Sequence, residues 1–156
     1  MTPDALRRLA TGALAIAFVV FAAVLVRTAW LCDDAYITFR TIENWAGGYG
    51  LRWNVAERVQ SYTHPLWMLL LAGVHVFTGE LYWTPLLVSL VISLAAGAVL
   101  ALRVAGSAGA GCAALLLALG SRAFVDFSSS GLEGPLVHLL LFLLVLALVQ
   151  EWRAWQ

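Results

Sequence analysis

The stretch "LATGALAIAFVVFAAVLV", residues 9–26, contains 18 consecutive residues without a charged side chain. A helix rises about 1.5 Å per residue, so about 20 apolar residues cross the roughly 30 Å hydrocarbon layer of a bilayer. Arg7 and Arg8 precede the stretch, and no small-x-small cleavage site follows it. We therefore predict a retained signal anchor, with a first transmembrane helix over residues 9–31.

The composition of the whole chain agrees with a membrane protein. Of the 156 residues, 62% are hydrophobic and only 12% are charged, and the mean hydropathy is +0.89. These values exceed what a soluble core needs. The net charge is zero, so charge implies no nucleic-acid partner. The two cysteines cannot form a disulfide framework.

Three further apolar stretches are long enough to cross a bilayer, at residues 83–102, 105–125 and 135–152. A fourth, residues 65–79, carries His75 and provides only about 22 Å of helix, which favours an interfacial position. We predict an all-α polytopic membrane protein with about four transmembrane helices plus extracytoplasmic juxtamembrane helices. A fifth crossing at residues 65–79 remains an alternative.

The four-helix count gives a definite topology. With a cytoplasmic N-terminus, residues 32–82 and 126–134 both lie outside the cell. Four arginines then lie on the cytoplasmic side, as the positive-inside bias requires: Arg7, Arg8, Arg103 and Arg153. Five crossings would instead separate Glu133 from the aspartates at 33 and 34. The sequence GSAGAG, residues 106–111, predicts a tight turn that leads into a small-residue helix face suited to close packing.

The outer segment begins with "DDAYITFR", residues 33–40, at the start of a helix that we predict to run from Asp33 to Ala46 and to stop at Gly47. Helical spacing places Asp34 on one face with Thr38 and Thr41. A second face, about 100° away, carries four residues: Asp33, Ile37, Arg40 and Asn44. One reading is that an aspartate caps the helix and that both favour its positive end.

The block "GGYGLRWNVAERVQSYTHPLW", residues 47–67, alternates charged and aromatic side chains. Arg52 and Arg58 have the bidentate geometry that suits a phosphate, although contact with lipid headgroups is the alternative. Tyr62 and Trp67 are also typical of an interfacial aromatic belt. His64 precedes a proline and fits a structural role as well as a binding one. Glu133, in "SSGLEGPL", residues 129–136, starts the last predicted helix, where the helix dipole favours an acid.

These three blocks, in this order, resemble the N-terminal part of the GT-C superfamily of membrane glycosyltransferases. The nearest likeness is to the cell-wall arabinofuranosyltransferases that use a polyprenyl-phosphate-arabinose donor. Their pattern has the form DDA-[FY]-I-[ST]-x-R, G-x-G-L-x-x-N-x-x-E-R-V-x-x-Y-[TS]-[NH]-P-L-W and S-G-[LM]-E. The resemblance covers roughly residues 32–136.

The resemblance implies an inverting transfer from a polyprenyl-phosphate sugar to a cell-envelope glycan, lipid or protein acceptor. It implies a bacterial inner-membrane protein whose active face is extracytoplasmic. Asp33 is the expected catalytic base, and Asp34 would orient it. The residues expected to bind the donor phosphate are Arg40, Arg58 and Arg52. Those expected to bind other parts of the substrates are Glu133, Tyr62, His64 and Trp67. Mg²⁺ or Mn²⁺ is compatible with oxygen ligands from Asp33, Asp34 and Glu133.

Members of this superfamily continue through several more transmembrane helices. We therefore expect this chain to correspond to the N-terminal portion of such an enzyme. This portion is either active by itself, completed by another chain, or an inactive remnant. The main alternative is a non-catalytic membrane scaffold or assembly subunit whose aspartates serve only the helix terminus. A small transporter is disfavoured, because the crossings contain few ionisable groups and no paired broken helices.

Overall fold

The structure is a computed structural model that describes residues 1–57 and 59–155, the side chain of Arg153 excepted. The described residues form helices and connecting loops and contain no strand. In chain order the helices are α1 (Pro3–Arg27), α2 (Asp33–Ala46), α3 (Pro65–Thr78), α4 (Trp83–Val99), the π-helix η1 (Leu100–Val104), α5 (Ala108–Gly120), α6 (Arg122–Phe127) and α7 (Gly134–Ala154). The predicted all-α class is confirmed.

Three helical segments are long and apolar enough to cross a membrane: Pro3–Arg27, Trp83–Val104 and Gly134–Trp152. They correspond to three of the four predicted crossings. The first helix begins earlier than predicted, because the Thr2 hydroxyl accepts a hydrogen bond from the Ala5 N–H and caps it. It also ends earlier, at Arg27. The second continues beyond α4 through the π-helical turn η1.

The remaining predicted crossing, residues 105–125, is not one continuous helix. It is divided into α5, with 13 residues, and the short helix α6. Ser121 separates them because its backbone is extended (φ −92°, ψ 105°) and its hydroxyl accepts a hydrogen bond from the Phe124 N–H. At about 1.5 Å per residue, α5 is only about 20 Å long. The described residues thus contain three helices of spanning length, where the sequence predicts four.

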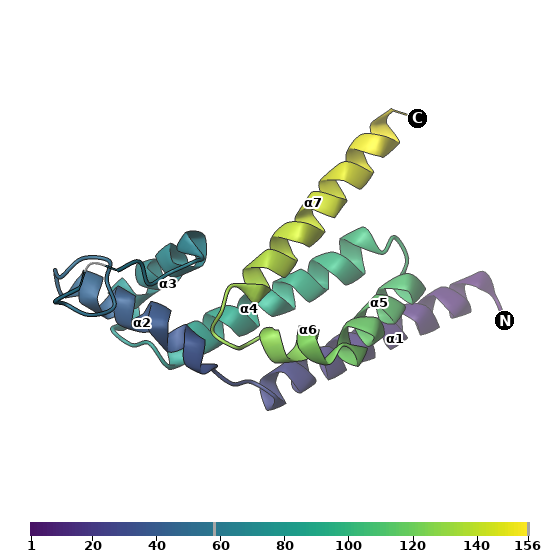
Figure 1. The fold of residues 1–156 in the computed structure, drawn as a ribbon. Coiled ribbons are helices and arrows are strands. Elements are labelled where there is room, and N and C mark those ends of the chain that lie inside the picture. The colour runs from purple at the N-terminus through teal and green to yellow at the C-terminus, as the bar shows by residue number, and fades with distance from the viewer. Residues whose placement is uncertain (58, 156) are drawn as a thin grey trace.

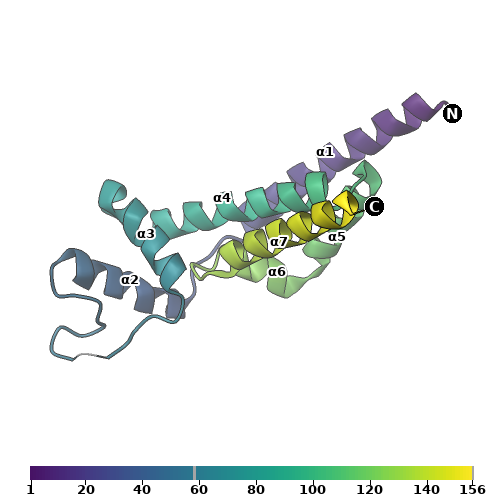
Figure 2. The same cartoon turned by 90° about the horizontal axis from the view of Figure 1, so that it is seen from above.

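The helices run to and fro between two ends of the molecule (Figures 1 and 2). At one end lie α2, α3 and the loop that joins them. At the opposite end lie both termini and the turn between η1 and α5. Between these ends α1 packs mainly against α5, and α4 mainly against α7. Although α5 and α6 are separate helices, together they return the chain to the end where α2 begins.

Small residues allow the helices to approach closely, as the sequence predicts. A Cβ atom on Gly111 of α5 would lie 2.4 Å from the carbonyl oxygen of Ala101 in η1. A Cβ atom on Gly97 of α4 would lie 2.6 Å from the ring of Phe21 in α1. Glycine is required at both places because no side-chain atom fits.

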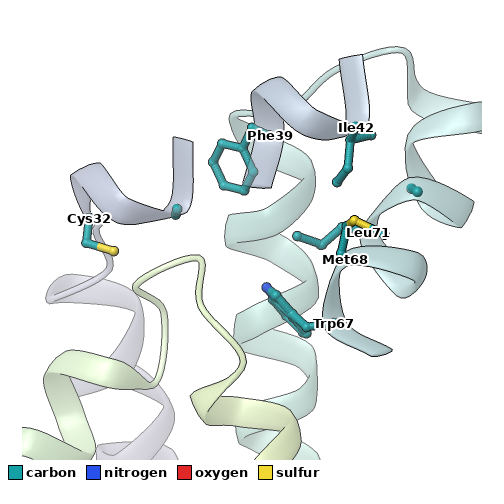
Figure 3. Close-up of a cluster of buried hydrophobic side chains, with 8 residues drawn as sticks. Cys32, Phe39, Ile42, Trp67, Met68 and Leu71 are labelled. Carbon is teal, nitrogen blue, oxygen red and sulfur yellow. The ribbon is translucent and has the colours of Figure 1, made fainter. Parts of the chain in front are cut away.

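A separate hydrophobic cluster holds α2 and α3 together at their end of the molecule (Figure 3). The cluster includes Phe39 and Ile42 of α2 and Met68 and Leu71 of α3, all buried. Trp67, only 1% exposed, is its largest member. Full burial of side chains of this size contributes about 1.5–3 kcal/mol each. The cluster therefore fixes the polar face of α2 relative to the loop that precedes α3.

Candidate functional site

The two aspartates occupy the first turn of α2, as predicted, but neither is its N-cap residue. That residue is Cys32, and no side chain caps it. Asp33 Oδ1 instead accepts a hydrogen bond of 3.1 Å from the neighbouring Asp34 N–H. The reading in which an aspartate caps this helix is therefore wrong. The Asp34 carboxylate accepts no hydrogen bond from any described residue.

The predicted face of Asp34, Thr38 and Thr41 is confirmed. Thr38 and Thr41 are both buried and bond to the extended segment before α3. The Thr41 hydroxyl lies 2.7 Å from Ser61 Oγ and also donates to the Ile37 carbonyl oxygen. This back-bond leaves the Thr41 oxygen as the acceptor for the Ser61 hydroxyl. Polar contacts thus join α2 to the segment before α3, in addition to the packing of Tyr62 against the hydrophobic cluster.

The His64 ring contacts three side chains. Its Nε2 is 2.9 Å from the Thr38 hydroxyl, and its Nδ1 is 3.1 Å from Glu133 Oε2 and 3.2 Å from the Thr63 hydroxyl. Through these contacts His64 connects α2 to the start of α7.

The loop before α7 brings Glu133 to this place through backbone contacts. The Cys32 N–H donates to the Ser130 carbonyl oxygen at 2.9 Å, and the Trp67 indole N–H donates to the Gly131 carbonyl oxygen at 2.8 Å. Gly131 has a φ of +83°, and a Cβ atom there would lie 2.9 Å from the Ala35 side chain. Only glycine satisfies both the conformation and the close approach. Figure 3 shows the Trp67 indole nitrogen directed toward this loop.

These residues line a cavity of about 550 Å³, which we call the His64 cavity. Its lining comes from α2, from the segment before α3 and from the loop before α7: Asp34, Ile37, Thr38, Gln60, Ser61, Tyr62, Thr63, His64, Leu132 and Glu133. Four of the predicted site residues are thus brought together: Asp34, Tyr62, His64 and Glu133. Gln60, Ser61 and Thr63 were not predicted. Five consecutive residues of this segment line the cavity, so no periodic pattern distinguishes them.

Other predicted site residues lie elsewhere. Asp33 does not line the His64 cavity. Trp67 is buried in the hydrophobic cluster, supports the loop before α7 and does not line the His64 cavity. Arg40 lines a different cavity, against Trp53. Arg52 lines an adjoining cavity that shares Gln60 and Tyr62 with the His64 cavity. Arg58 lies outside the described residues.

The carboxylates predicted as metal ligands do not form a metal site. The described part of the chain contains no group of three histidine, cysteine, aspartate or glutamate side chains that could hold an ion. Glu133 is paired with His64, while Asp33 contacts its own helix terminus. We therefore derive no step through a divalent cation.

Comparison of the chain with protein-family models, with curated proteins and with solved structures gives no match.

Proposed function

We propose that this chain is a membrane glycosyltransferase, or the N-terminal portion of one, that moves a sugar from a polyprenyl-phosphate donor to a cell-envelope acceptor. One observation carries the proposal. Asp34, His64 and Glu133 come from three separate segments and line one cavity. These segments belong to the three sequence blocks that resemble GT-C glycosyltransferases.

In the proposed reaction Asp34 is the general base, in place of Asp33. Its carboxylate takes the proton of an acceptor hydroxyl while that oxygen forms a bond to the anomeric carbon. The bond from the anomeric carbon to the phosphate oxygen breaks on the opposite face, and the polyprenyl phosphate leaves with the electron pair. The configuration at the anomeric carbon is therefore inverted.

The other residues bind and orient the substrates. Glu133 uses one oxygen to hold His64, which leaves its second oxygen for a sugar hydroxyl. Tyr62 borders both the His64 cavity and the adjoining cavity that contains Arg52. One terminal nitrogen of Arg52 donates to the Val55 carbonyl oxygen at 3.0 Å. Its other donors suit the departing phosphate.

We further propose that the His64 cavity faces the outside of a bacterial inner membrane. The end of the molecule that contains α2 and α3 lies opposite both termini (Figure 1). Arg7, Arg8 and Arg103 lie in segments near the end with the termini, and the positive-inside bias favours a cytoplasmic position for that end. A polyprenyl-phosphate sugar would then reach the cavity from the outer leaflet.

The test is transfer of radiolabelled sugar from polyprenyl-phosphate arabinose and polyprenyl-phosphate mannose by membranes that contain the chain. We expect Asp34→Asn to reduce transfer about 10²- to 10⁴-fold, the usual contribution of a general base. Asp33→Asn is the matched control, since it makes the same change one residue away. It should keep most of the activity, with equal amounts of protein verified by immunoblot.

Two results would contradict this function. Absence of transfer with every donor would show that this chain by itself has no such activity and would favour the scaffold alternative. Full activity of Asp34→Asn, or loss confined to Asp33→Asn, would overturn the assignment of the base.

A further inference from the structure

A second cavity lies beside α2 and shares no lining residue with the His64 cavity. We call it the Trp53 cavity, and its volume is about 430 Å³. Its lining comes from α2, from the loop after it and from the segment before α4: Tyr36, Phe39, Arg40, Glu43, Trp53, Leu81 and Tyr82. Three aromatic rings with polar atoms thus surround one cation and one anion.

Two side chains of α2 hold Trp53 in place. Arg40 Nε donates to the Trp53 carbonyl oxygen at 3.0 Å, and Asn44 Nδ2 donates to the same oxygen at 2.8 Å. The Arg40 guanidinium also lies over the Trp53 ring, 4.9 Å from its centroid. A cation over an indole ring is attracted to it. Contacts within the protein therefore hold Trp53 in place.

Three polar groups of the lining, the Glu43 carboxylate and the hydroxyls of Tyr36 and Tyr82, bond to no other side chain or backbone group of the described residues. Among the described residues, Glu43 forms no ion pair with Arg40 or with any other cation. The hydroxyls of Tyr36 and Tyr82 make no hydrogen bond within the described part of the chain, and both rings are about half exposed, at 46% and 50%. These groups are exposed to solvent, so a ligand that replaces their water can bond to them directly.

We propose that the Trp53 cavity binds a neutral saccharide, one segment of an acceptor glycan. Aromatic rings offer flat apolar surfaces to the C–H faces of a sugar ring, and their polar edges remain available for hydrogen bonds. The Glu43 carboxylate accepts hydrogen bonds from hydroxyls, and the Arg40 terminal nitrogens donate to ring or hydroxyl oxygens. A small number of placed polar groups within an aromatic lining is the usual composition of such sites.

Charge distinguishes a saccharide from a lipid headgroup. Arg40 and Glu43 bring one positive and one negative charge to the same cavity. A lipid phosphate that approached Arg40 would also meet the Glu43 carboxylate, and this repulsion opposes anion binding. A neutral sugar can instead use both side chains. The description of the saccharide as an acceptor rests on the proposed function, but binding in the Trp53 cavity itself requires neither the donor nor Asp34.

The test measures binding of linear hexasaccharides of arabinose, mannose and galactose to the full chain in zwitterionic lipid nanodiscs, by saturation-transfer NMR. We expect at least one hexasaccharide to bind. Trp53→Ala and Glu43→Gln should each weaken binding at least about tenfold, equal to 1.4 kcal/mol. Trp45→Ala is the matched control, since this exposed aromatic residue of α2 does not line the cavity.

Thermal unfolding of each variant shows whether it still folds. If Trp53→Ala does not fold, the nearly isosteric Glu43→Gln still tests the inference. Absence of binding for all three sugars would overturn the inference, as would equal binding by Glu43→Gln. Asp34→Asn should bind saccharide normally, which separates failure here from failure of the transfer reaction.

Discussion

Asp33 and Asp34 are adjacent in the sequence, yet the first turn of α2 directs their carboxylates to different surroundings. Asp34 lines the His64 cavity, whereas Asp33 contacts the backbone N–H that follows it. The helical repeat alone predicts this divergence, and it correctly groups Asp34 with Thr38 and Thr41. The choice between the two as base depends on which face meets His64 and Glu133, and local periodicity does not contain that information.

Trp67 shows the limit of residue-scale prediction most clearly. Its position beside a membrane segment is typical of an interfacial belt, but the structure buries it beneath the loop before α7. The reason is a partner 64 residues away in the chain, the Gly131 carbonyl oxygen. Long-range partners of this kind leave no pattern near the residue itself.

Trp67→Phe should destabilise the protein by about 1–3 kcal/mol, because the buried Gly131 carbonyl oxygen loses its donor. Thermal unfolding in detergent, followed by circular dichroism, measures the change. Trp45→Phe is the control, because its indole donates to no acceptor among the described residues and the ring is 43% exposed. Equal stability of the two variants would show that the Trp67 hydrogen bond does not hold the loop.

At the scale of single elements, the bounds of α2 are predicted correctly because both ends have local signals. Acids mark its first turn and Gly47 its end. The helix α3 is also predicted, as an apolar segment over residues 65–79 that is too short to cross a bilayer. The break at Ser121 is missed, because the apolar residues after Arg122 extend the predicted crossing to residue 125, whereas the Ser121 hydroxyl caps a new helical turn. The length of an apolar stretch thus predicts where the chain runs, but it does not predict whether that stretch forms one continuous helix.

The contact between α5 and η1 can be tested with a pair of glycine substitutions. Gly111→Ala should destabilise the protein by about 1–3 kcal/mol, because its Cβ atom would overlap the Ala101 carbonyl oxygen. Gly109→Ala, in the same helix, has open space and should be neutral or stabilising by up to about 1 kcal/mol. Thermal unfolding of the two variants measures the difference. Similar stabilities would contradict the close approach.

The start of α4 carries a pH-sensitive contact at Glu80. Desolvation by burial acts to raise the pKa of Glu80, but backbone N–H donors at Trp83, Thr84 and Tyr82 outweigh it, and the net pKa is lowered. A lowered pKa stabilises the folded state fully above the unfolded pKa of about 4.3. This stabilisation is lost as the pH falls below that value, through the folded pKa.

Glu80→Gln should therefore lower the melting temperature at pH 7 and leave it less dependent on pH between about 5 and 3 than in the parent chain. Melting temperatures across this range, measured for both proteins, provide the check. Glu57→Gln is a control in the exposed loop after α2, away from any helix start. Parallel pH curves for Glu80→Gln and the parent would show that Glu80 does not stabilise the start of α4.

At the scale of the whole molecule, the sequence predicts the helical class and the sites of three crossings, because apolar length is a direct consequence of bilayer thickness. It also predicts that residues 32–82 and 126–134 share one side, so that Glu133 and the aspartates at 33 and 34 can meet. The helical repeat places Arg40 and Asp34 on different faces of α2, but the formation of a separate cavity around Arg40 is not predicted. It depends on how the loop after α2 folds back onto the helix, and that loop has no periodic pattern.

The most direct test of the shared site is the side of the membrane that each segment faces. Single cysteines are introduced as Asp34→Cys, Glu133→Cys and Thr2→Cys, each in a chain with Cys32→Ala and Cys112→Ala, and intact cells are treated with a membrane-impermeant maleimide. We predict that the probes at positions 34 and 133 are both labelled from outside, and that the probe at position 2 reacts only after permeabilisation. Labelling of positions 34 and 133 from opposite sides would contradict a common cavity for Asp34 and Glu133.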